Sequence, residues 1–168
     1  MTDLRFAELP VPVMTALRDG DLDTARALTG LPMTAYFVTG EARALWRFRL
    51  AQLVRSPGDA PWIVRAAVTE PGGEVVGHAG FHAAPDEHGT VTVAYSVDPA
   101  HRRRGYARAM LAALIDRAAA DPAVRVVRAT IAPGNAASLA TIAGFGFAQA
   151  GEQWDEEDGL ELVFDLPV

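Results

Sequence analysis

The part of the sequence best suited to bind an anion is the short segment from Val97 to Ala107. It places a histidine and three consecutive arginines directly before Gly105. An alternating apolar pattern precedes the segment and a helical pattern follows it, so it joins a strand to a helix. The first N–H groups of a helix are unpaired and carry the positive end of its dipole, which attracts phosphate. The segment therefore predicts a site for a pyrophosphate-like anion, and the alternative is an exposed basic turn.

A second polar segment runs from Asn135 to Ser138, and Gly146 and Phe147 follow shortly after it. Asparagine and serine side chains can donate hydrogen bonds to a ligand and accept them from it. The same residue types also cap helix N-termini, so a purely local role is the alternative.

Together the two segments resemble the GCN5-related N-acetyltransferases (GNAT). Arg102 to Ala107 match the family's R/Q-x-x-G-x-G/A motif, and Asn135 to Ser138, followed by Gly146 and Phe147, match a second motif at the family's spacing. The N-x-x-S form is most similar to the branch that includes the ribosomal-protein N-terminal acetyltransferases. The resemblance covers essentially the whole chain. It implies an α/β fold with a mixed, mostly antiparallel sheet of six to seven strands and about four helices.

The resemblance also implies where acetyl-CoA binds as co-substrate, in a cleft where the strand ending at Val97 splays from the next one. Main-chain groups of Ser96 and Val97 would hold the pantetheine arm and the thioester carbonyl, and the following loop would cradle the pyrophosphate. Asn135 would bind the pantetheine or the adenine-side arm, and Ser138 would lie near the thiol. The cofactor-binding residues implied in this way are Ser96, Val97, Arg102, Arg103, Arg104, Gly105, Tyr106, Ala107, Asn135 and Ser138.

The activity implied by the resemblance is that of an acetyl-CoA-dependent N-acetyltransferase. The acetyl group would pass to a primary amine, of a protein N-terminus or of a small molecule, by direct attack in a ternary complex. Two positions depart from the family's pattern. Thr92 stands where many members have a glutamate base, and Ile142 stands where others have a tyrosine acid.

Ser138 and His82 are the catalytic candidates that remain. Ser138 can donate a proton or hold a water at the sulfur, and a histidine titrates in the range that a general base needs. Glu87 and His88 in the next turn are weaker candidates for the base. Catalysis without a dedicated base stays open, because positioning the amine beside a thioester supplies much of the rate. A catalytically silent acyl-CoA-binding or regulatory module is the alternative from a different class.

Composition narrows the remaining possibilities. The chain has 168 residues, a net charge of −6, no lysine and no cysteine. A net acidic chain is a poor nucleic-acid binder, and no apolar run approaches the ~20 residues that cross a bilayer. No group of histidines and carboxylates has metal-ligand spacing. We therefore expect one cytoplasmic domain over residues 1–168 with no metal, nucleic-acid or membrane partner, and a homodimer stays open as its assembly.

Hydrophobic periodicity supplies the elements that must position these residues. Helical patterns cover 12–18, 22–28, 41–55, 107–118 and 135–143, and strand patterns cover 4–9, 62–69, 74–82, 90–97, 124–131, 147–154 and 160–166. The order predicts one mixed α/β domain with an antiparallel meander before its central strand–helix–strand unit. The acceptor pocket is expected between the N-terminal helices and the final hairpin, where four aromatic residues are candidates to line it: Tyr36, Phe37, Trp46 and Trp154.

Overall fold

A twisted seven-stranded sheet runs through the centre of the computed structural model, which describes residues 2–168. Its strands lie in the order β1-β2-β3-β4-β5-β7-β6. All neighbouring strands are antiparallel except β4 and β5, which are parallel. The bounds are β1 (Asp3–Ala7), β2 (Arg65–Glu70), β3 (Val75–Phe81), β4 (Thr90–Val97), β5 (Val126–Ile131), β6 (Ala148–Asp155) and β7 (Gly159–Pro167). The expected mixed, mostly antiparallel α/β sheet is confirmed.

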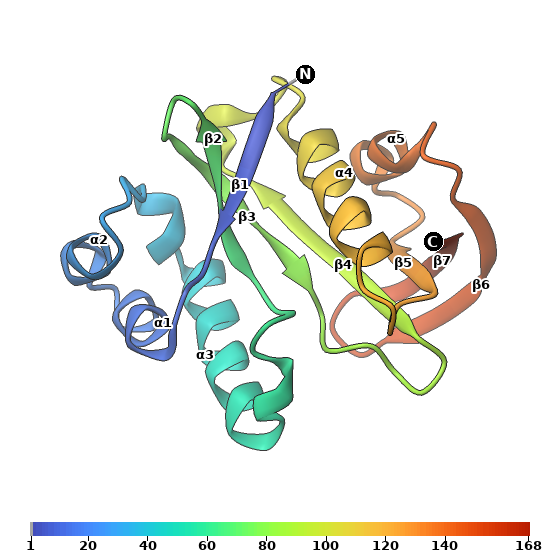
Figure 1. The fold of residues 1–168 in the computed structure, drawn as a ribbon, viewed down its shortest axis with the longest axis horizontal. Coiled ribbons are helices and arrows are strands. Elements are labelled where there is room, and N and C mark those ends of the chain that lie inside the picture. Colours follow the sequence, from blue (N-terminus) through green and yellow to red (C-terminus); the bar gives the residue numbers. More distant parts are fainter. Residues whose placement is uncertain (1) are drawn as a thin grey trace.

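Five α-helices accompany the sheet, where about four were expected. They are α1 (Val11–Arg18), α2 (Leu22–Thr29), α3 (Gly40–Arg55), α4 (Tyr106–Ala119) and α5 (Ala136–Ile142). Figure 1 shows α1 to α3 gathered at one side of the molecule and α4 and α5 at the other. The order of elements along the chain is the one that hydrophobic periodicity predicts.

Two apolar cores, one on each face of the sheet, hold the helices in place. Met110, Leu111, Leu114 and Ala118 of α4 are fully buried in the core that includes β4 and β5. Their spacing is the i, i+1, i+4, i+8 stripe that one face of a helix presents. The second core joins α1, α2 and α3 to β2 and β3, and Trp46 and Phe37 are fully buried in it. Each core packs against one face of the same sheet, so the sheet lies between two sets of helices.

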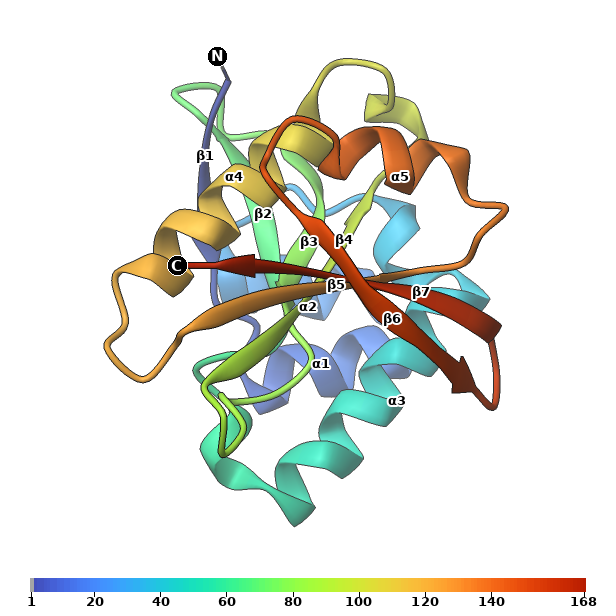
Figure 2. The same ribbon diagram turned by 90° about the vertical axis from the view of Figure 1, so that its right-hand side faces the viewer.

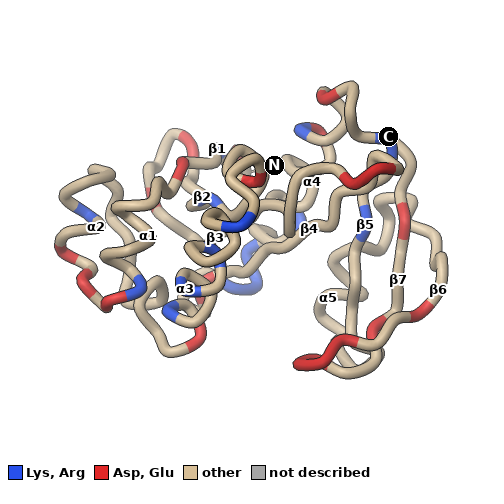
Figure 3. Tube along the Cα trace, turned by 90° about the horizontal axis from the view of Figure 1, so that it is seen from below, with Lys and Arg blue, Asp and Glu red and all other residues tan. Residues whose placement is uncertain are grey.

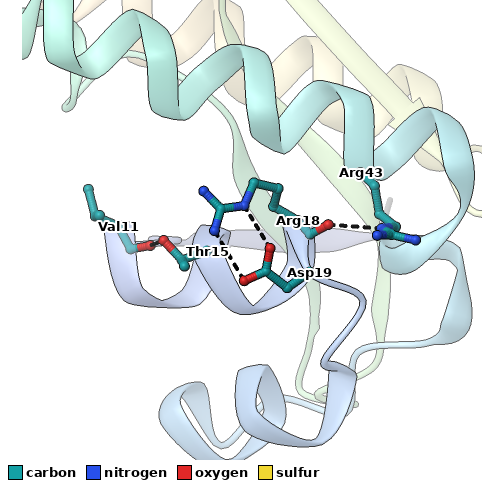
Figure 4. A network of polar contacts seen from close by, with 5 residues as sticks. All are labelled: Val11, Thr15, Arg18, Asp19 and Arg43. Atoms are coloured by element: carbon teal, nitrogen blue, oxygen red, sulfur yellow. Dashed lines mark hydrogen bonds and ion pairs between the residues drawn. The ribbon is translucent and has the colours of Figure 1, made fainter.

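The position of α3 depends on caps and on polar contacts to α1. The Thr39 hydroxyl accepts a hydrogen bond from the Ala42 N–H at 3.2 Å, so Thr39 is the N-cap of α3. Figure 4 shows Arg43 of α3 donating from Nε to the carbonyl of Arg18, at 2.8 Å, where α1 ends. These contacts add to the apolar packing that holds α3 against β2 and β3.

The two central parallel strands separate after a short paired stretch. Pairing between β4 and β5 covers Thr90 to Thr92 on one side and Val126 to Arg128 on the other. Figure 2 shows the two strands starting side by side and then diverging. The edge of β4 from Val93 to Val97 therefore faces a gap in the sheet rather than a neighbouring strand. This is the splay that the resemblance implies between the strand ending at Val97 and the next one.

Among residues 2–168, no helix combines the length and the apolar character needed to cross a membrane. Over the same residues, no three histidine, cysteine, aspartate or glutamate side chains are grouped so that they could hold a metal ion.

Candidate active site

The two motif segments, far apart in the chain, line one cleft. This cofactor cleft has a volume of about 600 Å³ and opens where β4 and β5 diverge. It is lined by Tyr95, Ser96, Val97, His101, Arg102, Arg103, Gly105, Tyr106, Ala107, Arg108, Asn135, Ala137, Ser138 and Thr141. Of the predicted cofactor residues, all except Arg104 lie in this lining.

The loop that leads from β4 into α4 is held by Asp98. Its carboxylate is buried and accepts hydrogen bonds from the Ala100 N–H at 3.0 Å and from the Thr34 hydroxyl at 2.6 Å. Arg103 adopts a φ of 60° and Gly105 a φ of 83°, both in the left-handed region. Only glycine enters this region without a steric cost, so Gly105 lets the chain turn sharply into α4.

The backbone of this loop presents a continuous row of free donors. No backbone N–H from Arg103 to Arg108 has a hydrogen-bond partner among residues 2–168, and the first bond into α4 runs from the Ala109 N–H to the Gly105 carbonyl. Unpaired N–H groups at the start of a helix attract anions, and the helix dipole adds to the effect. A Cβ placed on Gly105 would meet no atom within 4 Å, so the space beside Gly105 itself is open.

The three arginine side chains take different positions. Arg102 and Arg103 line the cofactor cleft, and Arg102 Nε donates to the Val97 carbonyl at 3.4 Å. Arg104 instead lines a neighbouring hollow together with Arg108 and Phe145. Arg104 therefore lines this neighbouring hollow instead of the cofactor cleft.

Asn135 is the N-cap of α5. Its side-chain oxygen accepts a hydrogen bond from the Ser138 N–H at 3.1 Å, which is the local role left open by the sequence. Both residues also line the cofactor cleft. The cap fixes the first turn of α5, which carries Ser138, whereas Ile142, the position of the missing family tyrosine, is the last residue of the helix and is buried in the core.

A second, smaller cavity of about 240 Å³ continues from the cleft along β5. This β5-side cavity shares Tyr95 and Ser138 with the cofactor cleft and includes His82, Asp158 and Glu161. The structure thus brings both predicted catalytic residues, Ser138 and His82, to one cavity. His82 is an exposed residue, yet desolvation of its ring by neighbouring protein atoms and the positive charge of Arg49 lower its pKa, while Asp155 opposes the shift. His82 is therefore a neutral imidazole near pH 7 and can accept a proton.

The other predicted residues lie away from these cavities. Thr92 is half-buried and opposite Arg128 of β5. Glu87 and His88 are exposed and pair with each other at 3.5 Å. Phe37 and Trp46 belong to the core, because apolar packing between α3 and the sheet encloses them fully, and Trp154 is 74% exposed on the final hairpin. Tyr36 alone of the four aromatic candidates lies at the site, where its hydroxyl is hydrogen-bonded to that of Ser96.

Five residues of the cleft lining were not among the predicted cofactor-binding residues: Tyr95, His101, Arg108, Ala137 and Thr141. Tyr95 lies in the strand pattern of residues 90–97, and no sequence pattern showed that it would line several cavities. Arg108 donates to the carbonyls of Thr141 and Ala143 at the end of α5. Its position three residues after Gly105, on the first turn of α4, was the signal that could have identified it.

Comparisons with known proteins agree with this geometry. The acetyltransferase (GNAT) domain family matches residues 13–148. An uncharacterized N-acetyltransferase, YjdG, from Bacillus subtilis (strain 168) is 27% identical over 149 residues, which cover 86% of this chain and 85% of the relative.

Solved structures of acetyltransferases have the same fold. RimL, a ribosomal L7/L12 alpha-N-protein acetyltransferase in complex with coenzyme A, superposes with a TM-score of 0.66 at 17% identity and covers 100% of this chain and 96% of its own. The microcin C7 self-immunity acetyltransferase MccE, in complex with acetyl-CoA and AMP, has a TM-score of 0.66 at 11% identity, with 99% and 93% covered. These likenesses show the fold, and the family match spans most of the sequence. The chain belongs to the GNAT acetyltransferase family and is an acetyl-CoA-dependent acyltransferase.

Proposed function

We propose that the described chain works as one N-acetyltransferase domain that acetylates a primary amine by direct attack in a ternary complex. The observation that carries the proposal is the row of free N–H groups from Arg103 to Arg108, which faces a cleft that continues along the unpaired edge of β4. A diphosphate with an extended polar arm fits this combination, because the phosphates need donors and the arm can pair with a strand edge.

The chain's own residues would hold acetyl-CoA by its two ends. The N–H row at the start of α4 would bind the pyrophosphate, and Arg102 and Arg103 would add positive charge beside it. Backbone groups of Ser96 and Val97 would pair with the pantetheine arm, and Asn135 would contact it from α5. Acetyl-CoA supplies an activated acetyl group as a thioester.

Ser138 and His82 would handle protons on opposite sides of the reacting carbonyl. Ser138 lines both the cofactor cleft and the β5-side cavity, so its hydroxyl is available to the sulfur as the thiol leaves. We propose that His82 accepts the proton of the attacking amine, directly or through a water. Its lowered pKa keeps it neutral at pH 7, as a general base must be.

Acidic residues surround the opening through which the amine would enter. Asp158 and Glu161 line the β5-side cavity, and Figure 3 shows acidic residues gathered at the tip between β6 and β7. Negative potential at an entrance raises the local concentration of a cationic substrate. This favours an amine, of a protein N-terminus or of a small molecule, as the acceptor.

The test is a release assay for coenzyme A with a panel of peptides and small amines. We expect saturable acetyl-CoA binding and thiol release that depends on at least one amine. Mass spectrometry of the product should show one added acetyl group on nitrogen. Saturable binding with no turnover on any amine would contradict the proposal and favour a silent acyl-CoA-binding module.

A further inference from the structure

A third cavity opens on the other face of β4, between α3 and the meander. This α3-side cavity has a volume of about 180 Å³ and is lined by Leu45, Arg49, Val64, His78, Gly80, Phe81, Ala94, Tyr95 and Ser96. It shares Ser96 with the cofactor cleft and Tyr95 with both other cavities. The cavity thus begins next to the place proposed for the thioester and leads away under α3.

Arg49 is a buried charge in the wall of this cavity. The residue is only 5% exposed, and its Nε has no hydrogen-bond partner among residues 2–168. Nη1 donates to two neutral oxygens, the Gln52 side chain at 2.6 Å and the His82 carbonyl at 2.8 Å. Within the described chain Arg49 forms no ion pair with a carboxylate.

Compensation of this charge from the protein is indirect. Asp59 accepts a hydrogen bond from Gln52 at 2.7 Å, and its charge favours the protonated form of Arg49, but burial acts more strongly and lowers the pKa of Arg49. Of the other titratable wall residues, His78 has a pKa of about 4 and is neutral near pH 7, and burial raises the pKa of Tyr95, which is neutral as well. Burial of an incompletely paired guanidinium is costly, and an anion bound beside it would offset that cost.

The remaining wall is largely apolar. Leu45, Val64, Phe81 and Ala94 line it, so a ligand there needs a hydrophobic portion as well as a negative group. The planar guanidinium fork matches the geometry of a carboxylate. A carboxylate in the cavity would also give Arg49 the charged partner that the fold does not provide.

We propose that the α3-side cavity binds the carboxylate of the amine acceptor through Arg49, so that the substrate class is an amino carboxylate with an apolar frame. The proposal rests on the proposed function, since the carboxylate is placed relative to an amine that attacks near Ser96. It assigns Arg49 to substrate recognition and leaves acetyl-CoA binding to the opposite face of β4.

The test compares four amino carboxylates with their neutral amides: L-leucine, L-phenylalanine, 4-aminobutyrate and 6-aminohexanoate. For at least one pair, kcat/KM should be about 10- to 100-fold higher for the acid, as one charge-assisted hydrogen bond allows. Arg49→Met should remove that preference and leave the KM for acetyl-CoA unchanged. Arg47→Met, two residues earlier on the same helix and exposed, is the matched control and should keep it.

A binding measurement separates this proposal from the proposed function. Hexanoate, which has no amine, should bind the CoA-saturated parent in a calorimetric titration, and hexanamide should not. Lack of turnover on every amine would contradict the proposed function, while hexanoate binding that Arg49→Met abolishes would still support the anion site. The proposal that Arg49 binds the carboxylate of the acceptor would be wrong if kcat/KM were equal for acids and amides and hexanoate did not bind the parent. If Arg49→Met fails to fold, two comparisons on the parent still test the proposal: the kcat/KM of acids against amides, and the binding of hexanoate against hexanamide.

Discussion

The side-chain oxygen of Asn135 accepts a hydrogen bond from the backbone N–H of Ser138 at 3.1 Å. One residue of the second motif therefore positions the other, because the cap starts α5 and orients its first turn toward the cofactor cleft. The same asparagine lines the cleft, so its capping role and its proposed contact with the pantetheine arm can be separated experimentally.

Asn135→Ser keeps a capping oxygen and removes the amide, whereas Asn135→Ala removes both. Asn135→Ala should lower the free energy of unfolding by about 1 kcal/mol, and Asn135→Ser by only a few tenths. Both should weaken acetyl-CoA binding by about 3- to 10-fold, the value of one hydrogen bond. Thermal melts and calorimetry measure the two effects. If Asn135→Ser bound acetyl-CoA as tightly as the parent, Asn135 would have only its capping role and no contact with the pantetheine arm.

Gly105→Val should weaken acetyl-CoA binding by more than about 10-fold, because a β-branched residue does not tolerate the φ of 83° that aims the N–H row. Gly30→Val is the matched control. Gly30 has a φ of 67° at the end of α2, and a Cβ there also meets no atom within 4 Å. Calorimetry should show the loss of affinity in Gly105→Val alone. Equal acetyl-CoA affinities of the two variants would show that the pyrophosphate does not bind at this loop.

His82→Ala should lower kcat/KM by on the order of 10²-fold, the usual contribution of a general base. Because its pKa is lowered, the acid limb of the parent's pH profile should have a midpoint below the usual histidine value of about 6.5. That limb should vanish in His82→Ala and persist in His88→Ala, which alters an exposed histidine. A parent profile that follows only the pKa of the amine, with no effect of His82→Ala, would show catalysis without a dedicated base.

His78 should make the protein less stable in mild acid. Its ring stacks on Tyr36 and lies beside Arg49, and burial lowers its pKa to about 4. The unfolded chain binds a proton near pH 6.5 and the folded chain only near pH 4, so stability falls as the pH decreases through this window. The loss is about 3 kcal/mol at its full extent.

Denaturant unfolding at pH 7 and at pH 4.5 measures this effect. His78→Phe keeps an aromatic ring at the stack and should flatten the pH dependence, whereas His88→Phe should leave it as in the parent. A parent protein whose free energy of unfolding is the same at both pH values would show that His78 does not titrate in this way.

Much of the architecture was determined by the sequence alone, because it depends on local patterns. The 3.6-residue period from Ala107 to Ala118 and the alternation from Thr90 to Val97 are properties of a helix and a strand that need no distant partner. The signal for the proposed pyrophosphate loop was equally local, since the arginines, Gly105 and the start of α4 are adjacent in the chain. Boundaries shifted by one to a few residues: the strand expected from Val124 begins at Val126.

The tertiary structure alone decided which residues from separate elements share a cavity. His82 and Ser138 line one cavity because β5 diverges from β4 after Thr92 and leaves a space between the two strands. Arg49 reaches the His82 carbonyl because packing of α3 against the sheet sets its distance from β3. The sequence offered Phe37 and Trp46 as candidates to line the acceptor pocket, but it could not distinguish a pocket from the core in which both are buried. That difference depends on how completely neighbouring elements fill the space, which is a property of packing between segments distant in the chain.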